Sequence, residues 1–317
     1  MQGQHKRQIS FSDQAVEHKV SDDDFLIRMD KQIDWRRFEV VFKKLYASTG
    51  RPSYPPLMLF KMLLLQQWFG LSDPAVEAVV KDRLSFHRFL DVSLEDVVPD
   101  ETTLVRFRQR LQSCDAAYKK LFSILNKQLD KAGVIIKHGT MIDASIIQSA
   151  RKPPSKRQGK ATSDEQANWA VKNGKATHGY KLHIGADCRS DVVRAIEVTP
   201  ANVHDSLIFD QLIQGDERII LADKAYHSQA RAERLRAQGK ANGIMRRAKP
   251  NEGLDRFERE INRIASKLRA PVERIFADWK QHRKLSRARY LGLERNRNHL
   301  LMMAMAHNMR CWLRSSG

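Results

Sequence analysis

Three acidic residues, each in a short motif of its own, are the positions of this sequence with the clearest chemical potential. Asp143 lies in TMIDAS, Asp223 in LADKAY and Glu273 in RAPVE, with Lys280 seven positions further along. Magnesium prefers a few oxygen ligands and keeps several waters, so two or three carboxylates can hold a metal pair against substrate phosphates. Such a site suits in-line phosphoryl transfer. The sequence therefore points to the cutting and joining of nucleic acid.

The charge of the chain favours a polyanionic partner. Lys and Arg number 56 against 37 Asp and Glu, which gives a net charge of +19 and a pI near 10.0. Residues 231–317 hold 22 basic and 8 acidic side chains, so +14 of that excess lies in the last part of the chain. A basic run on its own is usually a solvated helical surface. Here the excess surrounds the acidic motifs, which favours nucleic acid as the partner.

The length allows one large domain or two ordinary ones, and we expect two. The most apolar stretch, residues 57–69, is interrupted by Lys61 and by Gln66-Gln67, so no signal peptide or membrane span is expected. Three cysteines without metal-finger spacing predict neither a disulfide framework nor a zinc site and fit a reducing cytosol. They are Cys114, Cys188 and Cys311.

The first part of the chain has a helical pattern. Residues 1–25 are polar and aperiodic, which predicts a flexible arm. From Trp35 to Leu129 apolar residues recur at helical spacing, and the 57–69 segment is apolar nearly all round, so we expect it to be the buried helix. Ser72-Asp73-Pro74 is a helix start with proline just inside the cap.

A second capped helix could read DNA. Asp100 is placed to cap residues 102–111, in which Arg106, Arg108 and Arg110 lie off the apolar stripe. Short helices between 72 and 111 are compatible with a helix-turn-helix motif, but helical hairpins are common. DNA contact by Arg106 and Arg108 and plain structural support are equally consistent with this pattern.

A sheet is predicted from Gly133 onward. Period-two geometry puts Met141, Asp143 and Ser145 on one face of their strand, so the other, apolar face can pack while Asp143 points to an opening. The polar stretch from Arg151 to Lys175 is expected to be an exposed loop. Strands are predicted at 134–136, 140–147, 180–186, 192–198, 218–221 and 243–245, with a helix at 228–238.

Asp223 follows a run that is typical of a buried parallel strand, residues 218–222. Side chains at the carboxyl ends of such strands commonly form active sites, which suits a metal ligand. Lys224, the next residue, is either a DNA contact or a solvated end of the strand. The alternation of strands and helices predicts an α/β sheet layer.

Glu273 is expected on a helix that starts anew at Pro271, because proline is well tolerated at the first helical position. A stripe of four apolar residues would face the core. Glu273 and Lys280 would lie about 10 Å apart on a neighbouring face, so that Lys280 could hold a phosphate while Glu273 holds a metal. An ordinary surface pair is the alternative. The stripe is Val272, Ile275, Phe276 and Trp279.

At these residues the chain resembles the DDE transposases of bacterial insertion sequences, particularly the group called insertion sequence five. That group has a Tyr-x2-Arg-x3-Glu-x6-Lys motif around its last acid. Arg269, Glu273 and Lys280 match it, and Ser266 stands at the tyrosine position. The similarity runs from about Arg51 to Arg310. Further family-like stretches are GTMIDA (139–144), HGYKLH (178–183), TPANVHD (199–205) and ADKAY (222–226).

The resemblance implies an RNase H-like catalytic fold, a mixed sheet flanked by helices, at 131–317 with a basic loop at 151–177. A helical DNA-binding or dimerisation domain at 1–130 would precede it. Asp143, Asp223 and Glu273 would bind two Mg²⁺ ions, for which Mn²⁺ can substitute, and Arg269 and Lys280 would contact DNA phosphates. Water would cleave the strand, and the freed 3′-hydroxyl would attack target DNA.

The resemblance also implies terminal inverted repeats and target DNA as partners, a homodimer on DNA, and a bacterial cytoplasmic protein associated with the nucleoid. Only 50 positions separate Asp223 from Glu273, which leaves no room for the β insertion of relatives that excise through a DNA hairpin. Two other function classes remain open from the residues alone. They are a metal-dependent nuclease that does not join, and a non-catalytic DNA-binding repressor or decayed transposase.

Overall fold

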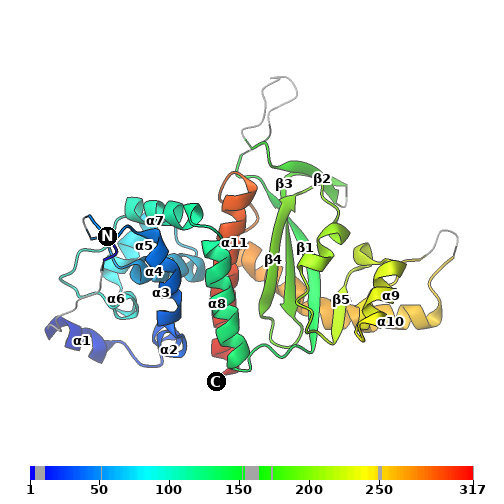
Figure 1. The fold of residues 1–317 in the computed structure, drawn as a ribbon, viewed down its shortest axis with the longest axis horizontal. Coiled ribbons are helices and arrows are strands. Elements are labelled where there is room, and N and C mark those ends of the chain that lie inside the picture. Colours follow the sequence, from blue (N-terminus) through cyan, green and yellow to red (C-terminus); the bar gives the residue numbers. More distant parts are fainter. Residues whose placement is uncertain are drawn as a thin grey trace. The chain divides into compact units, whose positions relative to one another are not determined.

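The computed structural model describes residues 1–3, 11–50, 52–151, 153, 164–172, 174–248 and 252–316. The chain forms two compact units. The first comprises Met1–Lys131 and Leu301–Gly317, and the second comprises Ala132–Leu300. Helices make up the first unit, and a mixed sheet flanked by helices makes up the second, as the RNase H-like expectation requires (Figure 1).

In the first unit, α4 is the central helix. It has Pro56 at its start and ends at Gly70, whose φ of 63° is the left-handed conformation that glycine adopts without strain. Nearly every side chain of α4 is buried, which confirms the prediction for this segment. Even Lys61 is buried, where it donates to Asp30 Oδ1 at 2.6 Å and to the carbonyl of Phe89 at 2.8 Å. The helices of this unit are α1 (Phe11–Lys19), α2 (Phe25–Gln32), η1 (Trp35–Phe38), α3 (Glu39–Phe42), η2 (Lys43–Leu45), α4 (Pro56–Phe69), α5 (Asp73–Asp82), α6 (Leu84–Leu90), α7 (Glu101–Ser113) and α8 (Ala117–Lys131).

The predicted arm at residues 1–25 is wrong for its second half. Residues 11–19 form α1, and Val16 and Val20 pack with Ile27 in a small apolar cluster. Two buried residues four positions apart fix a short helix without giving the sequence a clear period. Residues 4–10 of the predicted arm lie outside the described residues.

The C-terminal helix α11 (Leu293–Ser315) runs from the second unit into the first. The sequence placed all of residues 131–317 in the second domain, whereas residues from Leu301 onward pack in the first unit. Burial explains the difference, because Leu301 to Ala306 are buried on every side of the helix. The Trp68 indole donates to the carbonyl of Ala306 at 2.9 Å. In the described part of the chain, no helix is both long and apolar enough to cross a membrane.

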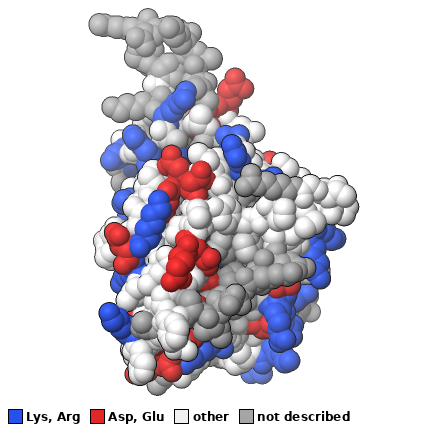
Figure 2. Space-filling view, turned by 90° about the vertical axis from the view of Figure 1, so that its left-hand side faces the viewer, with Lys and Arg blue, Asp and Glu red and all other residues white. Residues whose placement is uncertain are grey.

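Charge is unevenly distributed on the face of the molecule in Figure 2. Among its described residues, acidic side chains gather near the centre and basic ones toward the lower right. Ion pairs also join acidic and basic side chains in the described part of the first unit, such as those of Asp22 with Lys31 at 3.1 Å and with Arg88 at 2.6 Å. Basic side chains therefore do not cover this face uniformly, although the chain has a positive net charge.

The second unit is built on a sheet in the order β2-β3-β1-β5-β6, with β4 also paired to β3. β1 is antiparallel to β3 and parallel to β5, and β5 is parallel to β6. Both β2 and β4 are antiparallel to β3. The strands are β1 (Gly139–Gln148), β2 (Asn168–Lys172), β3 (Lys175–Asp187), β4 (Val193–Pro200), β5 (Ile219–Ala222) and β6 (Ala241–Ile244), and the helices are η3 (Asp205–Gln211), η4 (Lys224–Tyr226), α9 (Gln229–Ala237) and α10 (Arg256–His282).

Two details of the sheet differ from the sequence prediction. Residues 134–136 form no strand. Within the predicted loop at 151–175, residues 168–172 form β2, which pairs with the first residues of β3. β2 is an exposed edge strand whose Trp169 and Val171 are 51% and 72% exposed. Backbone pairing rather than an apolar face holds it, so hydrophobic patterning could not reveal it.

The helix α10 is continuous through Pro271, whereas the sequence predicted a new helix starting at that residue. An internal proline loses one backbone hydrogen bond and costs about 3 kcal/mol. Two features offset this cost: a capping box between Asp255 and Glu258, and the predicted apolar stripe, which is fully buried. Arg269 and Glu273 therefore lie one turn apart on a single helix.

The two faces of the sheet have different coverings. On one face, Ile142, Ile220 and Ala222 pack in a core cluster with Phe209 of η3 and Leu235 of α9. The helix α10 contacts β1, β5 and β6 and crosses behind the strands in Figure 1. Alternation along β1 turns its side chains at odd positions toward the face opposite the cluster. Met141, on that face, is also fully buried, so both faces of β1 pack rather than one.

Candidate active site

The sheet brings Asp143 and Asp223 together. In the parallel pairing of β1 with β5, Ile142 is in register with Ala222, and each acid is the next residue. Neighbouring strands lie about 4.8 Å apart, so Asp143, in the middle of β1, lies beside Asp223, the residue that follows β5. Asp223 follows the carboxyl end of β5 and caps η4, where its Oδ1 accepts from the backbone N–H of Lys224 at 2.6 Å.

Arg269 links Asp143 to Glu273. Its Nη1 lies 3.0 Å from Asp143 Oδ2, and its Nη2 lies 2.8 Å from Glu273 Oε1. The arginine side chain is 11% exposed, whereas that of Glu273 is 63% exposed. The third acid therefore faces solvent beside the buried pair, and one guanidinium joins α10 to β1.

The surroundings of Asp143 disfavour its charge. Burial raises the pKa of this carboxyl, and the nearby charge of Asp223 acts in the same direction. The Arg269 guanidinium, the backbone N–H of Ala144 and the ammonium of Lys172 oppose the rise without cancelling it. A buried carboxylate beside a second acid is stabilised by added positive charge.

Two lysines lie near these acids, Lys280 and Lys224, and they differ in burial. Lys280 is half-buried within electrostatic range of Asp143, and burial lowers the pKa of its ammonium, as does the charge of Lys172. Lys224 is exposed next to Asp223. Ser266, at the tyrosine position of the resembling family, is also exposed.

Tyr226 and Asp205, in the motifs ADKAY and TPANVHD, are two further residues near the acids, and the sequence analysis assigned no role to Tyr226. The Tyr226 hydroxyl is buried and makes no hydrogen bond within the described structure. Burial raises the pKa of that hydroxyl, and the charges of Asp205, Asp143 and Asp223 add to the rise. Asp205 Oδ1 lies 2.8 Å from Lys181 Nζ, and the cap of η3 is His204. The motifs ADKAY and TPANVHD were the available signals.

His183 is a neutral, structural residue. It pairs with Ala144 across the sheet, and its Nε2 lies 2.9 Å from Thr199 Oγ1. Burial lowers its pKa to about 4. Trp279 of the predicted apolar stripe is fully buried, whereas Trp169 on β2 is half-exposed.

The three acids offer oxygen donors to a divalent cation but are not gathered around one point. No group of three His, Cys, Asp or Glu side chains in the described residues is close enough to hold a metal ion. The acids are nevertheless all hard oxygen donors of the type that Mg²⁺ takes. The positive charge that now meets Asp143 and Glu273 is the Arg269 guanidinium. The three carboxylates are the right type of ligand for a cation and lie in the same region. Glu273 would have to leave Arg269 to bind the same ion as Asp143 and Asp223.

The two arginines proposed as DNA contacts in the first unit differ. Arg108 donates from Nη1 to Asp73 Oδ1 at 2.7 Å and to Gln66 Oε1 at 3.2 Å. It joins α7 to α5 and α4, so we do not retain it as a DNA contact. Arg106 is exposed on α7. The predicted caps are confirmed, because Asp100 accepts from Thr103 N–H at 2.7 Å and Ser72 from Ala75 N–H at 3.3 Å.

Comparison with known proteins gives two family matches. Residues 137–309 match the family described as Transposase DDE domain. Residues 14–110 match the family described as Transposase domain (DUF772). No solved structure matches the chain.

Proposed function

The chain belongs to the transposase DDE domain family, and from this premise we propose that it cuts DNA at the ends of an insertion sequence and transfers the freed 3′-hydroxyl into target DNA. Family membership makes the protein a transposase that acts on DNA. The cleavage and joining chemistry, the metal and the dimer are our proposals. So is the assignment to the insertion sequence five group, which rests on Arg269, Glu273 and Lys280.

One observation carries the proposal: Asp143, within β1, lies beside Asp223, which follows the end of the parallel strand β5, and Arg269 joins Asp143 to Glu273. We propose Asp143, Asp223 and Glu273 as the ligands of two Mg²⁺ ions. When bound, these ions would supply the charge that activates the attacking oxygen and stabilises the leaving one.

The protein side chains would prepare the site for this chemistry. The partly buried Asp143 carboxylate, whose pKa is raised by burial, would be stabilised by a bound cation. Arg269 and Lys280 supply positive charge on α10, where a phosphodiester could lie against them. Lys224 is a further candidate contact beside Asp223. Ser266 stands where the insertion sequence five motif has a tyrosine. Its short hydroxyl side chain cannot reach or stack on DNA as a tyrosine would.

The test uses purified protein and DNA that carries the ends of its element, identified as short inverted repeats flanking the coding region. With Mg²⁺ we expect joined products in which a 3′ end is linked to target DNA. Nicks without joining would instead identify a nuclease, and binding without cleavage in Mg²⁺ or Mn²⁺ would identify a repressor or a decayed transposase. DNA affinity should fall steeply with salt, because phosphate contacts release counterions.

The proposed homodimer can be tested on the same complex. Light scattering of the protein bound to two end fragments should give a mass of two chains and two duplexes. A mass of one chain on one duplex, unchanged by protein concentration, would contradict it.

A further inference from the structure

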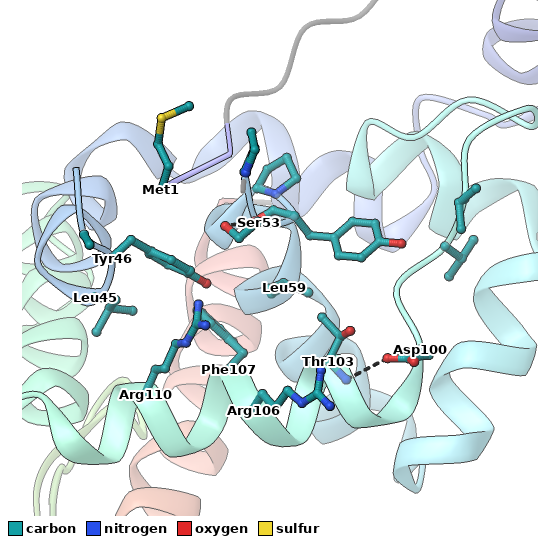
Figure 3. Close-up of a pocket in the computed structure, with 16 residues that line it drawn as sticks. Met1, Leu45, Tyr46, Ser53, Leu59, Asp100, Thr103, Arg106, Phe107 and Arg110 are labelled. Carbon is teal, nitrogen blue, oxygen red and sulfur yellow. Dashed lines mark hydrogen bonds between the residues drawn. The ribbon is translucent and has the colours of Figure 1, made fainter. Parts of the chain in front are cut away.

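The first unit contains a cavity of about 1010 Å³ beside α7 (Figure 3). Its walls come from α7, from residues 45–47 and 52–55, and from residues 97, 98 and 100. Leu59 and Phe107, both buried, contribute apolar surface, and Tyr46 and Tyr54 contribute half-buried rings. The volume is at the upper end of the range of small-molecule sites, so a nucleotide has room in it.

Two arginines of α7 line this cavity. Arg106 and Arg110 are one turn apart on the same side of the helix, and Figure 3 shows both reaching from α7 toward the space below Ser53 and Tyr46. Arg108, between them, is instead bonded to Asp73. The three arginines that the sequence could not distinguish thus separate into one structural residue and two that line the cavity.

The charges of the cavity are arranged along α7. The Arg110 guanidinium lies 4.7 Å from the centre of the Tyr46 ring, and no carboxylate of the described residues is paired with it. At the other end, Asp100 accepts from Thr103 N–H, and hydrogen bonds lower the pKa of its carboxyl, which keeps it ionised. Arg106 lies in the field of Asp100. An anionic ligand is therefore favoured at the Arg110 end.

A ligand with a flat apolar ring and a phosphate would match the aromatic rings and the arginines that line this cavity. Aromatic side chains offer stacking surfaces to every base, and arginine supplies the phosphate contact. We infer that the cavity binds one nucleotide of unpaired DNA, with the base against Tyr46 and the phosphate on Arg110. The inference rests on the proposed function for DNA as the partner.

The test measures base stacking in a protein that cannot cut. The parent is the Asp223→Asn variant, and the probe is a single-stranded ten-nucleotide DNA with a central 2-aminopurine. Binding should quench the 2-aminopurine fluorescence. Tyr46→Ala should abolish the quenching and weaken binding to single strands by about 5- to 160-fold, which corresponds to the loss of one stacked base. Affinity for duplex DNA should change less than twofold.

Three further variants keep the result interpretable. Tyr46→Phe retains the ring and should quench like the parent, and Arg110→Gln should weaken binding and reduce its salt dependence. Arg36→Gln, which removes an exposed arginine of the same unit, is the charge control. Circular dichroism checks folding. If Tyr46→Ala unfolds the protein, the test is the affinity for single strands of Arg110→Gln compared with that of Arg36→Gln. Equal affinity for single strands in those two variants would overturn the inference.

The same experiment separates this inference from the proposed function. Joined products from the wild-type protein without any 2-aminopurine quenching in the parent would overturn the inference and leave the function standing. Quenching that depends on Tyr46, in a protein whose wild type yields no cleavage, would support the nucleotide site and contradict the function.

Discussion

The site of the second unit and the cavity of the first have opposite charge balances. In the second unit, Arg269 is shared between Asp143 and Glu273, and a further acid lies alongside. In the cavity of the first, Arg110 contacts a tyrosine ring rather than an acid. One site is therefore suited to an added cation and the other to an added anion. The role of an arginine is set by its partners and not by its place in a basic sequence.

The largest effect expected from this comparison is the loss of cutting when a carboxylate is removed. Asp143→Asn, Asp223→Asn or Glu273→Gln should each lower the rate of strand cleavage at least about 100-fold, because bound metal ions supply several kcal/mol of transition-state stabilisation. DNA affinity, measured by fluorescence anisotropy, should stay within about twofold of wild type since phosphate contacts remain.

Matched controls lie on the same helix as Glu273. Glu260→Gln removes an exposed carboxylate that pairs with Arg263, and Asp255→Asn keeps a good helix cap. Both should cut like wild type. Wild-type turnover in any of the three carboxylate variants would refute their role as metal ligands.

Magnesium should stabilise the wild-type protein without DNA. At a concentration 100 times the dissociation constant, a ligand that binds only the folded state adds about 2.7 kcal/mol of stability. Differential scanning calorimetry in EDTA and in MgCl₂ would show the rise in Tm. The rise should vanish in Asp143→Asn. An equal rise in that variant would place the bound ion elsewhere.

Substitution of Arg108 and of Arg106 on α7 should change the stability of the protein by different amounts. Arg108→Gln removes one partner of an ion pair whose side chains are 17% and 21% exposed, which should cost about 2 kcal/mol. Arg106→Gln, on the exposed face, should change stability by less than about 0.5 kcal/mol. Urea unfolding measures both. Equal costs would contradict the assignment of Arg108 to structure and Arg106 to the cavity.

The smallest expected effect is that of Tyr226→Phe. The hydroxyl is buried without a hydrogen-bond partner, so its removal should leave the free energy of unfolding unchanged or raise it by up to about 1 kcal/mol. A loss of more than 1 kcal/mol in urea unfolding would indicate that the hydroxyl is bonded in solution.

The sequence predicted the local parts of this arrangement and missed the long-range ones. Period-two alternation located β1, and the apolar run before Asp223 located β5. The buried stripe of α10 was visible at helical spacing, but its continuity through Pro271 depends on packing that no local rule contains. The ion pair between Arg269 and Asp143 joins residues 126 positions apart, so neither of their motifs predicts it.

Charge patterns were equally incomplete as a guide to the first unit. Arg106, Arg108 and Arg110 alternate in sequence, and only the position of Asp73 on α5 separates the second from the others. The same limit applies to residues 301–309, whose burial depends on packing in the first unit, where the Trp68 indole bonds to the carbonyl of Ala306. Tertiary neighbours decide these roles.

The most direct test of the central claim is the position of divalent metal in crystals of the protein bound to its end DNA. Anomalous scattering from Mn²⁺ should show metal bounded by Asp143, Asp223 and Glu273, with Arg269 no longer bridging the first and third. A complex that joins DNA ends in the crystal buffer but shows no metal among these three carboxylates would contradict the account.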